Sequence, residues 1–149
     1  MKHDIIILLG ILLIGCQSQS QQSDSESDDL LYEQYWQFQE SMLFGIGDED
    51  TAIESLFKSA EAGYAESQSQ LGGCYAYRPD LIKREGADID SAVIWWLRAA
   101  EQDEWMAQRD LAYYYADIQD WKQAEFWLKR AKKNGYKDKE LQKQIRRNL

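Results

Sequence analysis

The sequence contains few of the residues that most often carry chemistry. Its 149 residues include one histidine, two cysteines and one proline. The histidine, His3, lies in a segment that we expect to be cleaved off, so the mature chain would have none. A chain without histidine excludes a Ser-His-Asp triad, a Cys-His pair and any histidine-containing metal site. A single proline leaves long stretches free to form helices.

Basic residues are outnumbered, since 17 Lys and Arg stand against 26 Asp and Glu, a net charge of -9. Phosphate backbones are bound by net-basic surfaces, so this excess argues against nucleic acid as the main partner. Apolar residues make up 44% and aromatic residues 13% of the chain. These fractions are enough to bury a core, and the length suits one domain.

The N-terminus has the pattern of an export signal. One lysine precedes an apolar run over residues 5–14, which is followed by Gly15 and Cys16. The run is shorter than the ~20 residues that span a bilayer. The segment resembles the lipobox of bacterial lipoproteins, in which the cysteine is lipidated and becomes the mature N-terminus. The alternatives are an ordinary signal peptide with a chance cysteine, whose A-x-A site is missing here, or an uncleaved short anchor.

This resemblance implies a signal peptide over residues 1–15 and a lipid attachment at Cys16. More than one acyl chain, at ~0.8 kcal/mol per buried CH₂, anchors a protein stably. Gln17 in place of aspartate after the cysteine implies the outer membrane, with the domain on the periplasmic side. Residues 17–29 contain no apolar residue and four acids, so we expect residues 16–29 to form a lipidated, disordered tether.

With Cys16 acylated, Cys74 has no disulfide partner within the chain. We expect Cys74 to be a small buried residue on a helix face. The alternative is a redox or intermolecular role.

From Leu30 onward the apolar residues recur at helical spacing. A first helix is predicted over residues 30–44, and a Thr51 to Glu54 capping box predicts the start of a second, which ends at Gly63. The buried face of this second helix is expected to consist of Ala52, Ile53, Leu56, Phe57 and Ala60. A further helix is expected over about residues 66–77, with Leu71, Cys74 and Tyr75 facing inward. A loop is expected over residues 78–88.

The pattern then repeats along the chain. A shift of forty residues places Ala52 on Ala92 and Leu71 on Leu111, and a further shift of 32 places Ala92 on Ala124. Helical repeats of this length, with small residues where helices cross, are typical of an α-solenoid. We predict an all-α fold, a short right-handed α–α solenoid over residues 30–149. Its repeats are expected at about residues 50–89, 90–121 and 122–149.

Three sets of residues fall in register with one motif. They are Asp50, Ala52, Ala60, Glu61, Gly63, Ala65, Gln68, Leu71, Gly72 and Tyr75; Asp90, Ala92, Trp95, Trp96, Ala99, Ala100, Glu101, Ala107, Gln108, Leu111 and Tyr115; and Asp120, Trp121, Ala124, Trp127, Ala131 and Gly135. The motif resembles the Sel-one-like repeats (SLR), a branch of the tetratricopeptide-type solenoids. The resemblance implies a protein that binds proteins and rarely catalyses. Residues 30–44 and 137–149 fall outside the motif, and we expect each to form a helix that caps an open end of the solenoid. Asp103 in place of a stop glycine, Trp105 in place of a small residue and Lys132 in place of alanine depart from the motif.

Carboxylates remain as candidates for general acid–base chemistry, but most of them fall at predicted helix ends, where they satisfy free N–H groups. The acidic runs at residues 48–50 and 88–90 do not continue as calcium loops. We therefore expect no catalytic residue, no metal and no cofactor, and we do not expect the protein to be an enzyme.

Positive charge gathers at the C-terminal end, where residues 129–149 contain nine basic and two acidic residues. The candidate basic patch consists of Lys129, Arg130, Lys132, Lys133, Arg146 and Arg147. One interpretation is a helix C-terminus and an amphipathic cap with Leu141 and Ile145 inward. The other is a contact for phosphate, lipid head groups or an acidic partner, while the acidic remainder of the chain faces a basic protein.

Aromatic residues present a similar choice. Trp95, Trp96, Trp121 and Trp127 occupy motif positions and are expected in the core. Trp105 and Tyr113 do not, so they are the candidates for a partner-binding hot spot.

These observations predict a membrane-anchored lipoprotein that faces the periplasm and binds another protein, either a basic effector or an envelope protein. The narrower hypothesis is an immunity protein that neutralises an envelope-targeting effector, such as a phospholipase or a cell-wall hydrolase. The alternative is a scaffold or assembly factor for an envelope complex, and a periplasmic enzyme is the third class.

Overall fold

The computed structural model describes residues 30–45, 47–83 and 88–149, and these residues form helices and connecting segments without a strand. The first helix covers residues 30–44. The elements that follow are α2 (Glu49–Glu61), α3 (Ala65–Tyr77), the 3₁₀ helix η1 (Pro79–Leu81), α4 (Ile89–Glu101), α5 (Trp105–Asp117), α6 (Trp121–Lys133) and α7 (Lys139–Asn148). The all-α prediction is confirmed. The predicted signal peptide, Cys16 and the tether lie outside the described residues.

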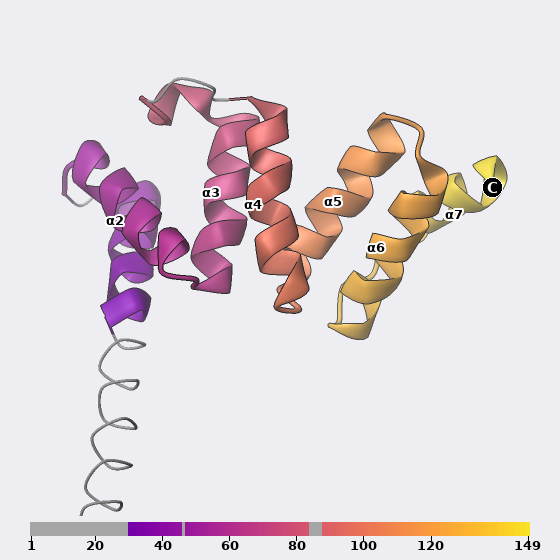
Figure 1. The fold of residues 1–149 in the computed structure, drawn as a ribbon, viewed down its shortest axis with the longest axis horizontal. Helices are drawn as coiled ribbons and strands as arrows, with labels where there is room; N and C mark the ends of the chain where they lie inside the picture. The colour runs from indigo at the N-terminus through magenta and orange to yellow at the C-terminus, as the bar shows by residue number, and fades with distance from the viewer. Residues whose placement is uncertain (1–29, 46, 84–87) are drawn as a thin grey trace, which may run out of the picture.

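Successive helices pack against one another along the long axis of the molecule, with the first helix and α2 at one end and α7 at the other (Figure 1). The helices α2, α4 and α6 each contain 13 residues and start at Glu49, Ile89 and Trp121. These starts reproduce the shifts of forty and 32 residues seen in the sequence. The predicted solenoid-like arrangement of helical repeats is therefore present. None of the described helices has both the length and the apolar character of a membrane span.

Acidic side chains start most of these helices. The N-cap carboxylates of α2, α4, α5, α6 and α7 each accept a hydrogen bond from a backbone N–H group of the first turn. They belong to Asp48, Asp88, Glu104, Asp120 and Asp138. The predicted capping box was wrong by one turn: Asp48 caps α2 by accepting from Thr51 N at 2.9 Å, so the helix starts before Thr51.

Several turns between helices use a left-handed residue whether or not the sequence supplies glycine. Gly63 and Gly135 have φ of 108° and 96°, and Asp103 and Gln119 adopt φ of 63° and 64°. Asp103 therefore takes the backbone conformation of the glycine that it replaces. Its carboxylate accepts hydrogen bonds from Arg130 at 2.6 Å and Gln108 at 3.2 Å, which offset part of the strain.

The residues that the helical spacing predicts to face inward are buried or partly buried, and further residues join them. The predicted inward face of α2 is buried, as are Leu71, Cys74, Leu141 and Ile145, while Tyr75 is partly buried. Leu81 and Ile82, in the segment predicted as a loop, also join the core. Of the four tryptophans expected in the core, Trp96 and Trp127 are buried and the other two are half-buried.

A glycine lets α3 and α4 approach closely. A Cβ atom added to Gly72 would lie 2.5 Å from Trp96 Cδ1, inside contact distance. Trp96 is 1% exposed, so its indole has little room to move. The next residue, Gly73, would place a Cβ atom with nothing within 4 Å. The two neighbouring glycines therefore have different roles: Gly72 admits the Trp96 ring, and Gly73 leaves space on the other side of α3.

Side-chain amides join each repeat to the next in a pattern that occurs twice. Gln68 donates to Ala60 O at 3.0 Å, and Gln102, at the end of α4, donates to Gln68 Oε1 at 2.9 Å and Gly63 O at 3.1 Å. The second copy starts with Gln108, which donates to Ala100 O at 3.2 Å. Asn134, at the end of α6, donates to Gln108 Oε1 and Asp103 O, both at 3.0 Å. We call these two sets of bonds the amide ladder.

Gly72→Ala should destabilise the fold by about 1–3 kcal/mol, because the new methyl group overpacks the Trp96 ring. Gly73→Ala is the matched control, and it should be neutral or stabilising by up to about 1 kcal/mol, since alanine is favoured over glycine inside a helix. Urea unfolding followed by circular dichroism measures both. Equal effects of the two substitutions would contradict the close approach of α3 and α4.

Candidate functional site

An open cleft lies between the first helix, α3 and α5, with a volume of about 290 Å³. We call it the α3–α5 cleft. Its lining residues are Phe38, Gln39, Met42, Ser69, Gln70, Gly73, Cys74, Tyr77, Arg78, Leu81, Met106, Arg109 and Asp110. Three helices from different parts of the sequence thus form one surface.

The apolar part of the α3–α5 cleft includes two flexible side chains. They are Met42 of the first helix and Met106 of α5. Methionine side chains are flexible and polarisable, so they adjust to ligands of different shape. Gly73 adds no side chain to the α3 wall, and a Cβ atom added there would have nothing within 4 Å. The cleft therefore has room for an apolar side chain from another molecule.

A bidentate ion pair lies on the α5 side of the cleft. Arg109 donates to both carboxylate oxygens of Asp110, at 2.8 Å and 3.1 Å. Asp110 is only 8% exposed, and burial raises the pKa of its carboxyl group, a shift that the Arg109 guanidinium opposes. The guanidinium also lies 5.7 Å from the ring centre of Trp105. Burying an ion pair costs solvation free energy, so the presence of the Arg109–Asp110 pair is weak evidence that it stabilises the fold.

Cys74 lines the same cleft from α3 and is buried, as expected. Burial raises the pKa of its thiol to about 11. The thiolate is the reactive form, so a thiol that stays protonated at neutral pH is inert. The geometry favours the structural interpretation of Cys74.

The two predicted hot-spot residues, Trp105 and Tyr113, lie on α5 and are each 38% exposed. Trp105 stacks on Tyr136, with ring centres 5.9 Å apart. The Tyr113 hydroxyl donates a hydrogen bond to Asp138, the residue that caps α7. Both side chains therefore contact the segment that leads into α7. Trp105 also adjoins the α3–α5 cleft through Arg109.

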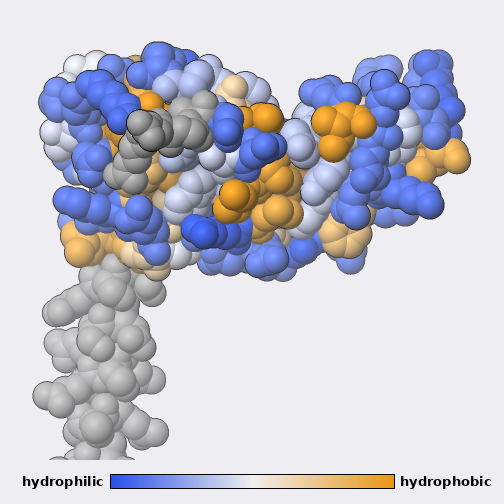
Figure 2. Space-filling model, turned by 45° about the horizontal axis from the view of Figure 1, so that its top comes forward, coloured by the Kyte–Doolittle hydropathy of each residue, from blue (hydrophilic) through white to orange (hydrophobic). Residues whose placement is uncertain are grey.

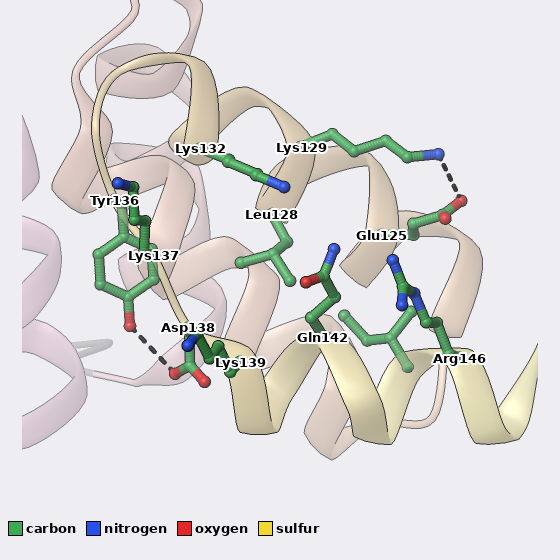
Figure 3. Close-up of a pocket in the computed structure, with 11 residues that line it drawn as sticks. Glu125, Leu128, Lys129, Lys132, Tyr136, Lys137, Asp138, Lys139, Gln142 and Arg146 are labelled. Carbon is green, nitrogen blue, oxygen red and sulfur yellow. Dashed lines mark hydrogen bonds and ion pairs between the residues drawn. The ribbon is translucent and has the colours of Figure 1, made fainter.

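The six basic candidates are divided among three environments. Arg130 is bound to Asp103 and lies 5.4 Å from the ring centre of Trp127. Lys129, Lys132 and Arg146 line a groove of about 220 Å³ between α6 and α7, which we call the α6–α7 groove (Figure 3). Its other lining residues are Glu125, Leu128, Tyr136, Lys137, Asp138, Lys139, Gln142 and Ile145. Lys133 and Arg147 are exposed and lie outside the groove.

Exposed apolar residues also occur outside the cleft and the groove. On the face shown in Figure 2, hydrophilic residues surround separate apolar patches. Exposed apolar residues on the even-numbered helices include Ile94 on α4 and Phe126 on α6. Across the described ranges, no group of three or more His, Cys, Asp or Glu residues could hold a metal ion.

Searches of protein-family models, curated proteins and solved structures found no match to this chain.

Asp110→Asn should change the pH dependence of stability in a defined direction. Because burial raises the folded-state pKa of Asp110, this carboxyl group contributes stability that is present at low pH and lost as the pH rises through that pKa. The asparagine variant should therefore gain stability relative to the parent protein above about pH 4, near the unfolded pKa of aspartate.

Urea unfolding of both proteins at acidic and neutral pH measures this change. Asp117→Asn, at an exposed position of the same helix, is the control and should show no such gain. A relative stability of Asp110→Asn that falls with rising pH would contradict the buried position of this charge.

Proposed function

We propose that the protein is a protein-binding module whose α3–α5 cleft receives an apolar side chain of its partner. The observation that carries this proposal is the composition of the cleft: two methionines, a bare glycine and a partly buried ion pair around one open volume. Pockets of this kind, mostly apolar with a few placed polar groups, are the usual sites of recognition. The resemblance of residues 50–136 to Sel-one-like repeats supports a binding role.

The charge of the whole chain, more than that of the cleft, indicates the chemistry of the partner. Within the cleft, Arg109 already donates to both oxygens of the Asp110 carboxylate. The chain as a whole carries a net charge of -9, which attracts basic proteins. An apolar side chain on a basic protein is therefore the partner feature that suits both the cleft and the net charge of the chain.

We further propose that the protein is anchored by lipid at Cys16 on the periplasmic side of the outer membrane. The lipobox-like sequence and the acidic, apolar-free segment 17–29 support this location. A module tethered there meets proteins that reach or work on the envelope. The narrower proposal is an immunity protein against an envelope-targeting effector, and the second is a scaffold for an envelope complex.

Site-specific photo-crosslinking in the native host tests the binding surface. A photo-reactive residue at Met106, inside the cleft, should give one adduct of defined mass. The same residue at Lys58, exposed on α2, should not. Gly73→Leu should abolish the Met106 adduct by filling the cleft, because a side chain at Gly73 meets no neighbouring atoms. An adduct from Ile94 on α4 but not from Met106 would place binding on the opposite set of helices.

The identity of the crosslinked protein separates the two narrower proposals. An effector that attacks the envelope, together with cell death on deletion of this protein only while that effector is active, is the result expected of an immunity protein. A resident envelope protein whose abundance falls on deletion is the result expected of a scaffold. Substrate turnover by the purified protein would contradict both.

A further inference from the structure

The α6–α7 groove combines an apolar floor with a basic rim. Leu128 of α6 and Ile145 of α7 are buried beneath it, at 7% and 1% exposure. In Figure 3, the Lys132 and Gln142 side chains lie on either side of Leu128, and the Arg146 side chain lies beyond Gln142, on the side of Glu125. A ligand in this position would touch hydrocarbon below and positive charge above.

Most of the positive charge at this rim is not neutralised by the protein. Lys129 pairs with Glu125 at 2.9 Å. The other four cations of the lining, Lys132, Lys137, Lys139 and Arg146, form no ion pair with the residues that the structure describes. The second acid of the lining, Asp138, accepts hydrogen bonds from Tyr113, Tyr136 and the backbone N–H group of Leu141. A cluster of uncompensated cations is a binding site for an anion.

We propose that the α6–α7 groove binds the head group of an anionic phospholipid at the membrane surface. Lys132 and Arg146 would hold the phosphate, and the first methylene groups would lie over Leu128. A phospholipid offers both features that the groove would bind: a negatively charged head group and the hydrocarbon that begins at its glycerol. Three of the four unpaired cations are lysines, which act as point charges toward a diffuse anionic surface, whereas carboxylate recognition in an acidic protein favours the planar fork of arginine.

The place of the groove in the molecule gives this contact a role. α7 and the first helix lie at opposite ends of the long axis (Figure 1). The inference rests on the membrane location in the proposed function, in which the N-terminal end is held by lipid at Cys16. A second contact at the α7 end would lay the solenoid along the membrane. Because the anchor at Cys16 already holds the protein there, the groove would meet lipid at a high effective concentration. This orientation would fix the direction in which the α3–α5 cleft faces.

Hydrogen exchange of the full-length protein, reconstituted on vesicles of phosphatidylcholine with or without phosphatidylglycerol, tests the proposal. With phosphatidylglycerol present, exchange in α6 and α7 should slow about tenfold, because two or more cations each gain attraction to the surface. Exchange in α2 and α3 should not change. About 1 M NaCl, where the Debye length is ~3 Å, should remove the difference.

Two double variants with the same change in charge test the groove itself. Lys132→Glu with Arg146→Glu should abolish the protection of α6 and α7. Lys122→Glu with Lys143→Glu changes exposed cations on the same two helices outside the groove, and it should keep most of the protection. Equal losses in the two double variants would overturn the assignment to the groove, and circular dichroism establishes that each variant is folded.

Soluble ligands show whether the groove prefers the anion of a lipid surface, of a free phosphate compound or of an acidic protein. Protection of α6 and α7 by free glycerol phosphate, with none from phosphatidylglycerol vesicles, would overturn the membrane assignment. Protection by an acidic polypeptide such as poly-glutamate, without protection by vesicles, would assign the groove to a protein partner instead. No partner protein is present in this assay, so its failure would leave the crosslinking result at Met106 unaffected.

Discussion

The amide ladder is the interaction on which the rest of the molecule depends. Gln68 and Gln108 are buried, and a buried amide must satisfy its donors and acceptor within the protein. Each glutamine donates to a carbonyl group of the other helix in its own repeat. It accepts from the residue that caps the C-terminus of the first helix in the next repeat, which is Gln102 or Asn134. The relative position of adjacent repeats is therefore set by directional bonds as well as by apolar packing, which is non-directional.

Both candidate surfaces follow from this alignment. The α3–α5 cleft needs α3 and α5, which belong to neighbouring repeats, to stand at a fixed separation. The α6–α7 groove needs α7 to be held at the end of the solenoid, where the Tyr113 hydrogen bond to Asp138 and the stacking of Trp105 on Tyr136 attach it. At the other end, Ser59 donates to Leu31 O at 3.0 Å and holds the first helix. A rigid scaffold of this kind loses little entropy when a partner binds.

Periodicity predicted the fold well, because buried positions such as Ala52, Leu71 and Ile145 recur at helical spacing. The repeat pattern placed Gln68 and Gln108 at equivalent positions. It did not identify their partners Gln102 and Asn134, because these two equivalent positions hold different residue types. The α3–α5 cleft was not predicted, since it is formed by side chains far apart in the chain. The basic charge was found in the sequence, but only the packing of α7 on α6 shows that Lys137 and Lys139 line the groove while Lys133 does not.

Native-state hydrogen exchange of Gln108→Met tests the ladder most directly, because methionine keeps the volume of the side chain and removes all of its hydrogen bonds. Exchange in α5, α6 and α7 should accelerate about tenfold to a hundredfold, since the Ala100 carbonyl group and the Asn134 amide lose a buried partner. Exchange in α2 and α3 should not change, and Gln123→Met, at an exposed position of α6, should have no effect. Unchanged exchange in Gln108→Met, or a uniform acceleration in every helix, would contradict the account.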